Sequence, residues 1–279
     1  MNHGEGTFKG AGGLELFEQH WRPDGEPRAV VALVHGIGEH SGRYMNAVNR
    51  LVPRGYAVYG FDHRGHGRSP GQRGYIRHWG EYREDVRLFL DWVRQREPNR
   101  PLFLMGHSMG GLIVLDYGLH HPQGLVGVIA SAPALGQTGV SPFLITLSKV
   151  MSAIYPAFSL DTGLDATAIS RDEGVVKAYT GDPLVHSKAT ARLGAEMVAT
   201  MKWTNEHAGE WRLPLLIVHG GADQIVPPAA SQAFFERVPV ADKERYEVEG
   251  GYHEPHNDLG WEQAVGVVER WLERHLPPA

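Results

Sequence analysis

An α/β fold with a mostly parallel sheet is the fold class that the sequence predicts. Short runs of Val, Ile and Leu alternate along the chain with longer stretches of helical periodicity. The apolar runs lack the strict alternation of a half-exposed strand, which indicates burial on both faces. Strands that alternate with helices in this way pair in parallel and are covered by helices on both sides of the sheet.

Apolar runs bounded by Gly, Pro or polar clusters predict the strands. An earlier pair of short strands is expected in and near Leu14–Trp21, which brings the predicted sheet to eight strands. The six later strands are predicted at Val30–His35, Tyr56–Phe61, Leu102–Met105, Gly124–Ser131, Leu215–His219 and Arg245–Val248.

Helical stretches separate these strands. In Glu81–Arg96 the apolar residues recur among charged ones at helical spacing, which is the pattern of an amphipathic helix with one face on the sheet. The predicted helices are Tyr44–Val52, Glu81–Arg96, Met109–His120, Ala229–Val238 and Trp261–His275.

The alternation of strand and helix stops after Pro133. Residues 134–210 contain two helix-like stretches and no convincing strand. We interpret 134–210 as a helical insertion after strand six, and 1–133 with 211–279 as the core. An insertion between two strands of a sheet fits a cap over a binding site. Four apolar residues of its first stretch would either pack a core or line a substrate pocket: Phe143, Leu147, Met151 and Ile154.

Composition narrows the classes of function. The net charge of −5 leaves no basic excess for nucleic acid, which is not expected as a partner. The chain has no cysteine, which excludes disulfides, thiolate metal sites and a cysteine nucleophile. Neither a signal peptide nor an uninterrupted membrane-spanning run is recognised. We therefore expect a cytoplasmic protein, soluble or peripherally associated with a membrane.

A serine lies in a glycine-rich turn between a predicted strand and a predicted helix. Gly106-His107-Ser108-Met109-Gly110 matches Gly-x-Ser-x-Gly in the strand–turn–helix context that this motif requires. The glycines remove side-chain clashes at a strained turn. The N–H groups that open the following helix favour developing negative charge at the same place. The pattern predicts that Ser108 is a nucleophile rather than an ordinary turn serine.

A neutral serine needs a base, which is usually a histidine oriented by a carboxylate. Loops at the carboxyl ends of later strands converge with the serine, in the chain order Ser, Asp or Glu, His. Asp223 follows one predicted strand, and His253 follows another through two glycines that let the loop bend inward. We predict Asp223 and His253 as the partners of Ser108, with His256 as the alternative base.

The loop after the predicted strand Val30–His35 supplies a second donor for an oxyanion. Gly36 and Gly38 leave the backbone of Ile37 free to approach a ligand. We assign the oxyanion hole to the backbone N–H groups of Ile37 and Met109. His35 is expected to brace the neighbouring loops without touching substrate.

Six segments, spread along the whole chain, are similar to those of one known family. The sequence resembles the α/β-hydrolase fold and, within it, the monoacylglycerol lipase and lysophospholipase-like group of serine aminopeptidase S33-type hydrolases. Two of the segments, GEHSGRY and DHRGHGRS, are more specific than the serine motif alone. The matching segments are HGIGEHSGRY (35–44), FDHRGHGRSPGQRGYI (61–76), GHSMGG (106–111), SRD with AYTGDPLV (170–185), HGGADQIVP (219–227) and GYHEPHND (251–258).

The resemblance implies a triad of Ser108, Asp223 and His253, a cap after strand six, and no metal or cofactor. It implies that the small-molecule partner is a lipid ester, most simply monoacylglycerol, which is hydrolysed to fatty acid and glycerol through an acyl-enzyme. The apolar face of the cap would hold the acyl chain. The family's alcohol-binding pocket carries over onto Glu39, Arg43, His107, Tyr179 and His256, although Glu39, Arg43 and His256 could equally brace the loops.

Alternatives remain open at this point. A broad carboxylesterase or a lysophospholipase would use the same triad, whereas a non-catalytic ligand-binding member of the fold would lack part of it. A dehalogenase or epoxide hydrolase would need a carboxylate where the chain has Ser108. The residues Asp62, His63 and Arg64 are interpreted as structural. The apolar face of the cap also suggests transient contact with a lipid surface, while the oligomeric state is left open.

Overall fold

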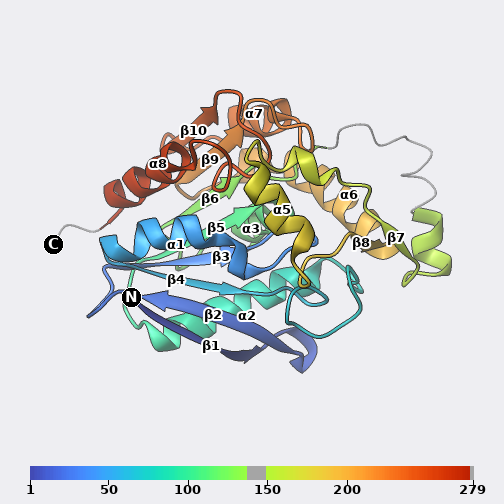
Figure 1. Cartoon of the computed structure of the whole chain (residues 1–279), viewed down its shortest axis with the longest axis horizontal. Helices are drawn as coiled ribbons and strands as arrows, with labels where there is room; N and C mark the ends of the chain where they lie inside the picture. The colour runs from blue at the N-terminus through green and yellow to red at the C-terminus, as the bar shows by residue number, and fades with distance from the viewer. Residues whose placement is uncertain (137–148, 277–279) are drawn as a thin grey trace.

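An eight-stranded sheet organises the computed structural model, which describes residues 1–136 and 149–276 (Figure 1). The strand order is β1-β2-β4-β3-β5-β6-β9-β10, with antiparallel pairing of β1 with β2 and of β2 with β4, and parallel pairing elsewhere. The strands are β1 (Asn2–Lys9), β2 (Glu15–Arg22), β3 (Ala29–Val34), β4 (Tyr56–Phe61), β5 (Leu102–His107), β6 (Gly127–Ser131), β9 (Leu215–Gly220) and β10 (Lys243–Val248).

Helices cover both faces of this sheet (Figure 1). Helices α1 and α8 pack on one face, while α2, α3 and α7 pack on the other. The helices are α1 (Met45–Leu51), α2 (Gly80–Arg96), α3 (Met109–His120), α5 (Glu173–Gly181), α6 (Ala191–Glu206), α7 (Pro228–Arg237) and α8 (Trp261–Arg274). The predicted α/β fold with a mostly parallel sheet is confirmed.

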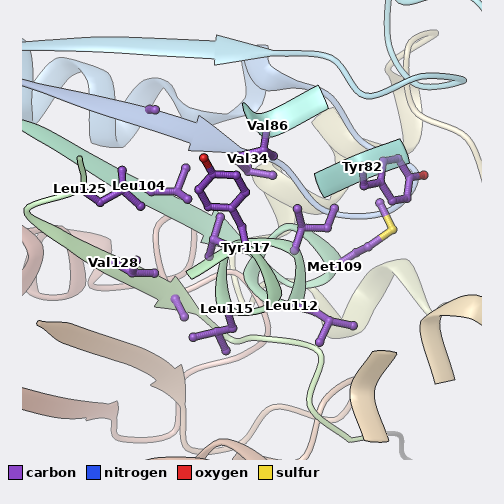
Figure 2. Packing of buried hydrophobic residues seen from close by; sticks show 14 of the residues in the cluster. Val34, Tyr82, Val86, Leu104, Met109, Leu112, Leu115, Tyr117, Leu125 and Val128 are labelled. Carbon is purple, nitrogen blue, oxygen red and sulfur yellow. The ribbon is translucent and has the colours of Figure 1, made fainter. Parts of the chain in front are cut away.

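Burial on both faces explains why the central strands read as continuous apolar runs. In β3, Val30 and Val34 join the core shared with α2 and α3, whereas Val31 and Leu33 join the core shared with α1 and α8. All six residues of this strand are buried. Figure 2 shows the first of these cores, with labelled side chains of α3, such as Leu115 and Tyr117, and of the strands, such as Leu104 and Val128.

The sequence underestimates the strands at two places. The pair of strands expected in and near Leu14–Trp21 is β1 and β2, but the bounds of β1 were not predicted, because it lies in the polar N-terminal stretch and all but one of its residues are at least partly exposed. The expectation of no strand in 134–210 is wrong, because β7 (Ser159–Asp161) and β8 (Lys188–Thr190) pair in an antiparallel way. A three-residue strand with an exposed face is too short to show a period in the sequence.

The segment between β6 and β9 leaves the sheet and contains α5, α6 and the β7–β8 pair. In Figure 1 these elements gather beyond the carboxyl ends of β3 and β5, where the loops of the core converge. The converging loops of the core therefore face the segment between β6 and β9. None of the helices in the described ranges is long and apolar enough to cross a bilayer.

Candidate active site

Ser108 lies in a sharp turn between β5 and α3, with backbone angles φ 54° and ψ −118°. The turn is tight enough to exclude side chains on either side. A Cβ atom at position 106 would lie 2.2 Å from the carbonyl oxygen of Gly110, and one at position 110 would lie 2.1 Å from that of Val34. Glycine is therefore required at both places, and the strained serine sits at the start of α3.

His253 bridges Ser108 and Asp223. Its Nε2 is 2.9 Å from the Ser108 hydroxyl, and its Nδ1 is 2.7 Å from Oδ2 of Asp223. A carboxylate can only accept, so Nδ1 carries the proton and Nε2 is free to accept from the serine. This is the arrangement in which a histidine can take a proton from a nucleophile. The structure thus brings together the three residues predicted from the sequence.

Asp223 is held as a carboxylate by donors on both oxygens. The backbone N–H groups of Ile225 and Val226 donate to Oδ1 over 2.8 and 3.0 Å. Burial alone would raise the pKa of Asp223, but hydrogen bonds with His219 and His253 and with the Val226 N–H hold its pKa below the usual range. A permanently charged carboxylate keeps the imidazole of His253 in the required orientation.

His219 is a member of this network that the sequence analysis missed. Its ring is fully buried, with Nε2 at 3.1 Å from Oδ2 of Asp223 and Nδ1 at 2.8 Å from the Ser231 hydroxyl. The signal was the histidine four residues before Asp223, at the end of a strand. Sixteen histidines in the chain made that signal indistinct.

His256 does not take the place of the base. Its ring stacks on Tyr44, with centroids 4.6 Å apart and planes within 3°, and neither ring nitrogen has a hydrogen-bond partner within the described residues. Burial, and then the charges of Arg43 and His253, lower the pKa of His256 to about 3. The His256 ring is therefore neutral and packs against the Tyr44 ring.

Two backbone N–H groups are available beside Ser108. Ile37 lines the cavity next to the serine, and Met109 is the first residue of α3. Within residues 1–136 and 149–276, neither the N–H of Ile37 nor that of Met109 has a backbone hydrogen-bond acceptor. Both groups can therefore donate to a ligand. The loop that carries Ile37 is fixed because Oε1 of Glu39 accepts from the Gly36 N–H over 2.6 Å and from the Tyr44 hydroxyl over 2.7 Å.

A buried ion-pair cluster borders the site. Arg43 donates to both oxygens of Glu254 over 2.6 and 2.8 Å and to Glu39 over 2.9 Å. Its guanidinium also lies 4.6 Å from the ring centre of Tyr179. Burial raises the pKa of Glu39; burial would also raise that of Glu254, but Arg43 holds the pKa of Glu254 below its usual range. Glu254 was not predicted from the sequence, where only its place beside His253 distinguished it.

Four of the five predicted alcohol-binding residues line a small cavity of about 20 Å³ beside Ser108: Glu39, Arg43, His107 and Tyr179. The fifth, His256, is not among the residues that line it. His107 lies 3.2 Å through Nδ1 from the carbonyl oxygen of Ser131. Burial, with His253 and His256 nearby, holds the pKa of His107 well below its usual value, so the ring is neutral.

A larger cavity of about 450 Å³ opens on the other side of Ser108. Its lining is mostly apolar. Helix α6 contributes Leu193, Met197 and Met201, and the loop after Asp223 contributes Ile225. The two cavities share Ile37, Ser108, Leu164 and Ile225. The serine therefore lies where a cavity bordered by charged and polar side chains meets one bordered mostly by apolar residues.

The predicted apolar wall is only partly within the structure. Phe143 and Leu147 lie outside the described residues. The prediction is wrong for Met151 and Ile154, which are not among the residues lining the cavity, and the side chain of Ile154 is 75% exposed. Helical spacing identifies an apolar side of a helix, but it does not tell which surface that side meets.

The residues interpreted as structural make hydrogen bonds away from the serine. Asp62 accepts from the backbone N–H and hydroxyl of Ser41 over 2.9 and 2.6 Å. Arg64 pairs with Asp85 over 2.7 and 2.8 Å. His35 accepts through Nε2 from the N–H of His63 over 2.9 Å. These contacts tie the loops after β3 and β4 to each other and to α2.

Comparisons with known proteins identify the family of the chain. A family model described as serine aminopeptidase, S33 matches residues 25–260. The monoacylglycerol lipase of Mycolicibacterium smegmatis is 38% identical over 274 residues, which cover 98% of this chain and 98% of that protein. The crystal structure of Paleococcus ferrophilus monoacylglycerol lipase aligns with a TM-score of 0.86 at 38% identity, covering 94% of this chain and 100% of that one.

A second solved structure, of a soluble variant of Saccharomyces cerevisiae monoglyceride lipase in complex with a substrate analogue, aligns with a TM-score of 0.89 at 25% identity. The alignment covers 98% of this chain and 96% of that one. Matches of this extent include the whole sheet and the segment between β6 and β9. The chain therefore belongs to the α/β-hydrolase family that the S33 model describes, among its monoacylglycerol lipase-like members, and is a carboxylic ester hydrolase.

Proposed function

We propose that the protein hydrolyses monoacylglycerol to fatty acid and glycerol, with Ser108 as nucleophile, His253 as general base and Asp223 as its orienting carboxylate. One observation carries the proposal. The hydroxyl of Ser108, hydrogen-bonded to His253 over 2.9 Å, lies where the large cavity meets the small one, which is lined by Glu39, Arg43, His107 and Tyr179. An ester with an apolar acyl chain and a polar alcohol group matches this arrangement.

The first half of the reaction forms the acyl-enzyme. His253 takes the Ser108 proton through Nε2 as the hydroxyl oxygen attacks the ester carbonyl. Asp223 stabilises the imidazolium that forms, because its carboxylate stays charged. The backbone N–H groups of Ile37 and Met109 donate to the developing oxyanion, and removing one such donor typically costs about 3–4 kcal/mol. His253 then gives its proton to the departing glycerol oxygen.

The second half repeats these steps with water. His253 takes a proton from water, the hydroxide attacks the acyl-enzyme carbonyl, and the proton returns to Ser108 as the fatty acid leaves. No group other than water is consumed.

The side chains that line the small cavity suit the hydroxyl groups of the glycerol half of the substrate. Burial raises the pKa of Tyr179 to about 12, so its hydroxyl is a neutral donor and acceptor. His107 is neutral, and with Nδ1 directed at the Ser131 carbonyl it presents Nε2 as an acceptor. Glu39 and Arg43 make most of their hydrogen bonds with each other, with Glu254 and with the loop after β3. We assign direct hydroxyl contacts to His107 and Tyr179, and bracing to Glu39 and Arg43.

Residues 134–210 are proposed to act as a cap that meets a lipid surface. The part of this segment after residue 148 exposes apolar side chains, and one of them, Leu164, is 40% exposed while also lining the large cavity. A peripheral, cytoplasmic enzyme would collect its substrate there. The exposed apolar residues are Val150, Ile154, Tyr155, Phe158, Leu160 and Leu164.

The catalytic proposal is tested by Ser108→Ala. The variant should lose ester hydrolysis and labelling by a fluorophosphonate probe while its circular dichroism is unchanged; Ser187→Ala, an exposed serine, is the control. Rates on monoacylglycerol, diacylglycerol, lysophospholipid and short p-nitrophenyl esters then identify the substrate. Retained activity in Ser108→Ala would remove the proposal, and a preference for lysophospholipid would replace monoacylglycerol.

The membrane proposal has a separate test. Ile154→Glu with Tyr155→Glu should weaken flotation with phosphatidylcholine vesicles and lower the rate on vesicle-bound monoacylglycerol more than on a water-soluble ester. Leu259→Glu, an exposed apolar residue in the loop before α8, is the matched control. Equal flotation of all three proteins, or no flotation of the unmodified one, would contradict the proposal.

A further inference from the structure

The inner face of α6 forms one wall of the large cavity. Leu193, Gly194, Met197 and Met201 all line it. Positions 194, 197 and 201 are three and seven residues apart, which places them on one side of the helix. This side therefore presents two long flexible side chains and, one turn before them, a position with no side chain.

Gly194 has no structural reason to be glycine within the described protein. It is the fourth residue of α6, its φ is not in the left-handed region, and a Cβ atom there would have no heavy atom within 4 Å. Glycine inside a helix is less favourable than alanine because its backbone loses more freedom on folding. The helix is weakened at this point without any gain in packing or backbone geometry.

Other glycines at the site have a clear steric reason. A Cβ atom at position 106 or 110 would meet backbone atoms at 2.2 and 2.1 Å. At Gly194 the space is open and belongs to the cavity. The glycine thus preserves volume that none of the residues in 1–136 and 149–276 fills.

The position of Gly194 indicates which half of the substrate needs this volume. Gly194 lines only the large cavity and is absent from the small one beside Tyr179. The lining of the large cavity is mostly apolar and includes Leu193, Met197 and Met201 of α6 and Ala189 of β8. An acyl chain fits these surroundings better than a glycerol hydroxyl does.

We propose that Gly194 determines acyl-chain specificity: its missing side chain keeps open the part of the cavity that long acyl chains occupy. The proposal rests on the proposed ester hydrolysis at Ser108. It assigns substrate selection to the first turn of α6, and it makes the size of residue 194 the limit on chain length.

The test compares Gly194→Ala and Gly194→Leu with the unmodified enzyme on monoacylglycerols from butyryl to oleoyl, at concentrations normalised by fluorophosphonate titration. One methylene in an apolar pocket changes kcat/KM by about 10- to 200-fold. The ratio of kcat/KM for oleoyl to that for butyryl substrate should therefore fall at least about tenfold in Gly194→Leu, and less in Gly194→Ala. Gly181→Ala and Gly181→Leu are matched controls, because Gly181 ends α5, meets nothing within 4 Å and lies outside the cavity lining.

Thermal unfolding separates specificity from packing. Gly194→Ala should raise Tm by about 2 °C through helix propensity, while it narrows the range of substrates. A lower Tm would show that the glycine is needed for the fold, and an unchanged chain-length profile would show that the space is not used; either result overturns the inference. If the unmodified enzyme cleaves none of the esters, the proposed function fails instead, so the two failures are distinguishable.

Discussion

The two walls of the large cavity are built on different principles. The core wall, with Ser108 and the loops after β3 and β9, is held by buried hydrogen bonds whose donors and acceptors are specified atom by atom. The wall formed by α6 presents Gly194 and two methionines, which set volume and little else. The difference supports the proposal that the sheet side carries the chemistry, while the side between β6 and β9 selects the substrate.

The largest expected effect comes from the core wall. Asp223→Asn keeps the shape of the side chain, but its amide can face His253 with a donor, which favours the wrong imidazole tautomer. Such a change lowers kcat by about 10⁴-fold in an enzyme of this type. Steady-state kinetics with a soluble ester, together with a circular dichroism spectrum that shows the fold is retained, would confirm it. A fall in activity of less than tenfold would contradict the inference that the hydrogen bonds of the core wall carry the chemistry.

A smaller effect is expected where the two walls meet. Arg43→Ala removes the cation shared by Glu39 and Glu254 and its contact with Tyr179 of α5. Leaving buried carboxylates without a partner typically costs about 3–5 kcal/mol of folding free energy. Urea unfolding measures that loss. The Arg43→Lys variant, which keeps the charge but not the bidentate geometry, should lose less folding free energy. Equal stability of Arg43→Ala and the unmodified protein would show that the pair has little energetic weight.

The smallest effect is a dependence of stability on pH. The pKa of Asp223 is lower in the folded protein than its ordinary value of about 3.9. A depressed carboxyl pKa adds stability that is present above the unfolded pKa and is lost as pH falls through the folded one. Chemical unfolding between about pH 5 and pH 2.5 should therefore show a steeper decline for the unmodified enzyme than for Asp223→Asn. Parallel curves would mean that Asp223 is not held as a carboxylate by folding.

The sequence predicted the parts of this molecule that local rules determine. Val30–His35 is apolar because two helical layers bury it, and the glycines around Ser108 are forced by contacts within a few ångströms, so both were recognisable. The order of nucleophile, acid and base followed from where parallel strands end. Each of these features is encoded in a short stretch of chain.

What the sequence could not show depends on partners that are distant along the chain. Glu254 is important because Arg43 lies against it, although the two are 211 residues apart. The apolar side of the helix at 149–154 turns outward, so that Ile154 is exposed, and no periodicity reveals that choice. The division of the chain at 134 and 210 stays a prediction.

The loop that carries the base is joined to the segment between β6 and β9. The N–H of Glu254 donates to the carbonyl of Ile169 over 2.8 Å, and Arg171 pairs with Asp258 over 2.9 Å. If that whole segment rotated as a rigid body, it would move the neighbours of His253, and His253 would no longer be positioned to take the proton of Ser108. If other parts of the segment were to move, residues 169–171 would therefore have to stay with the core.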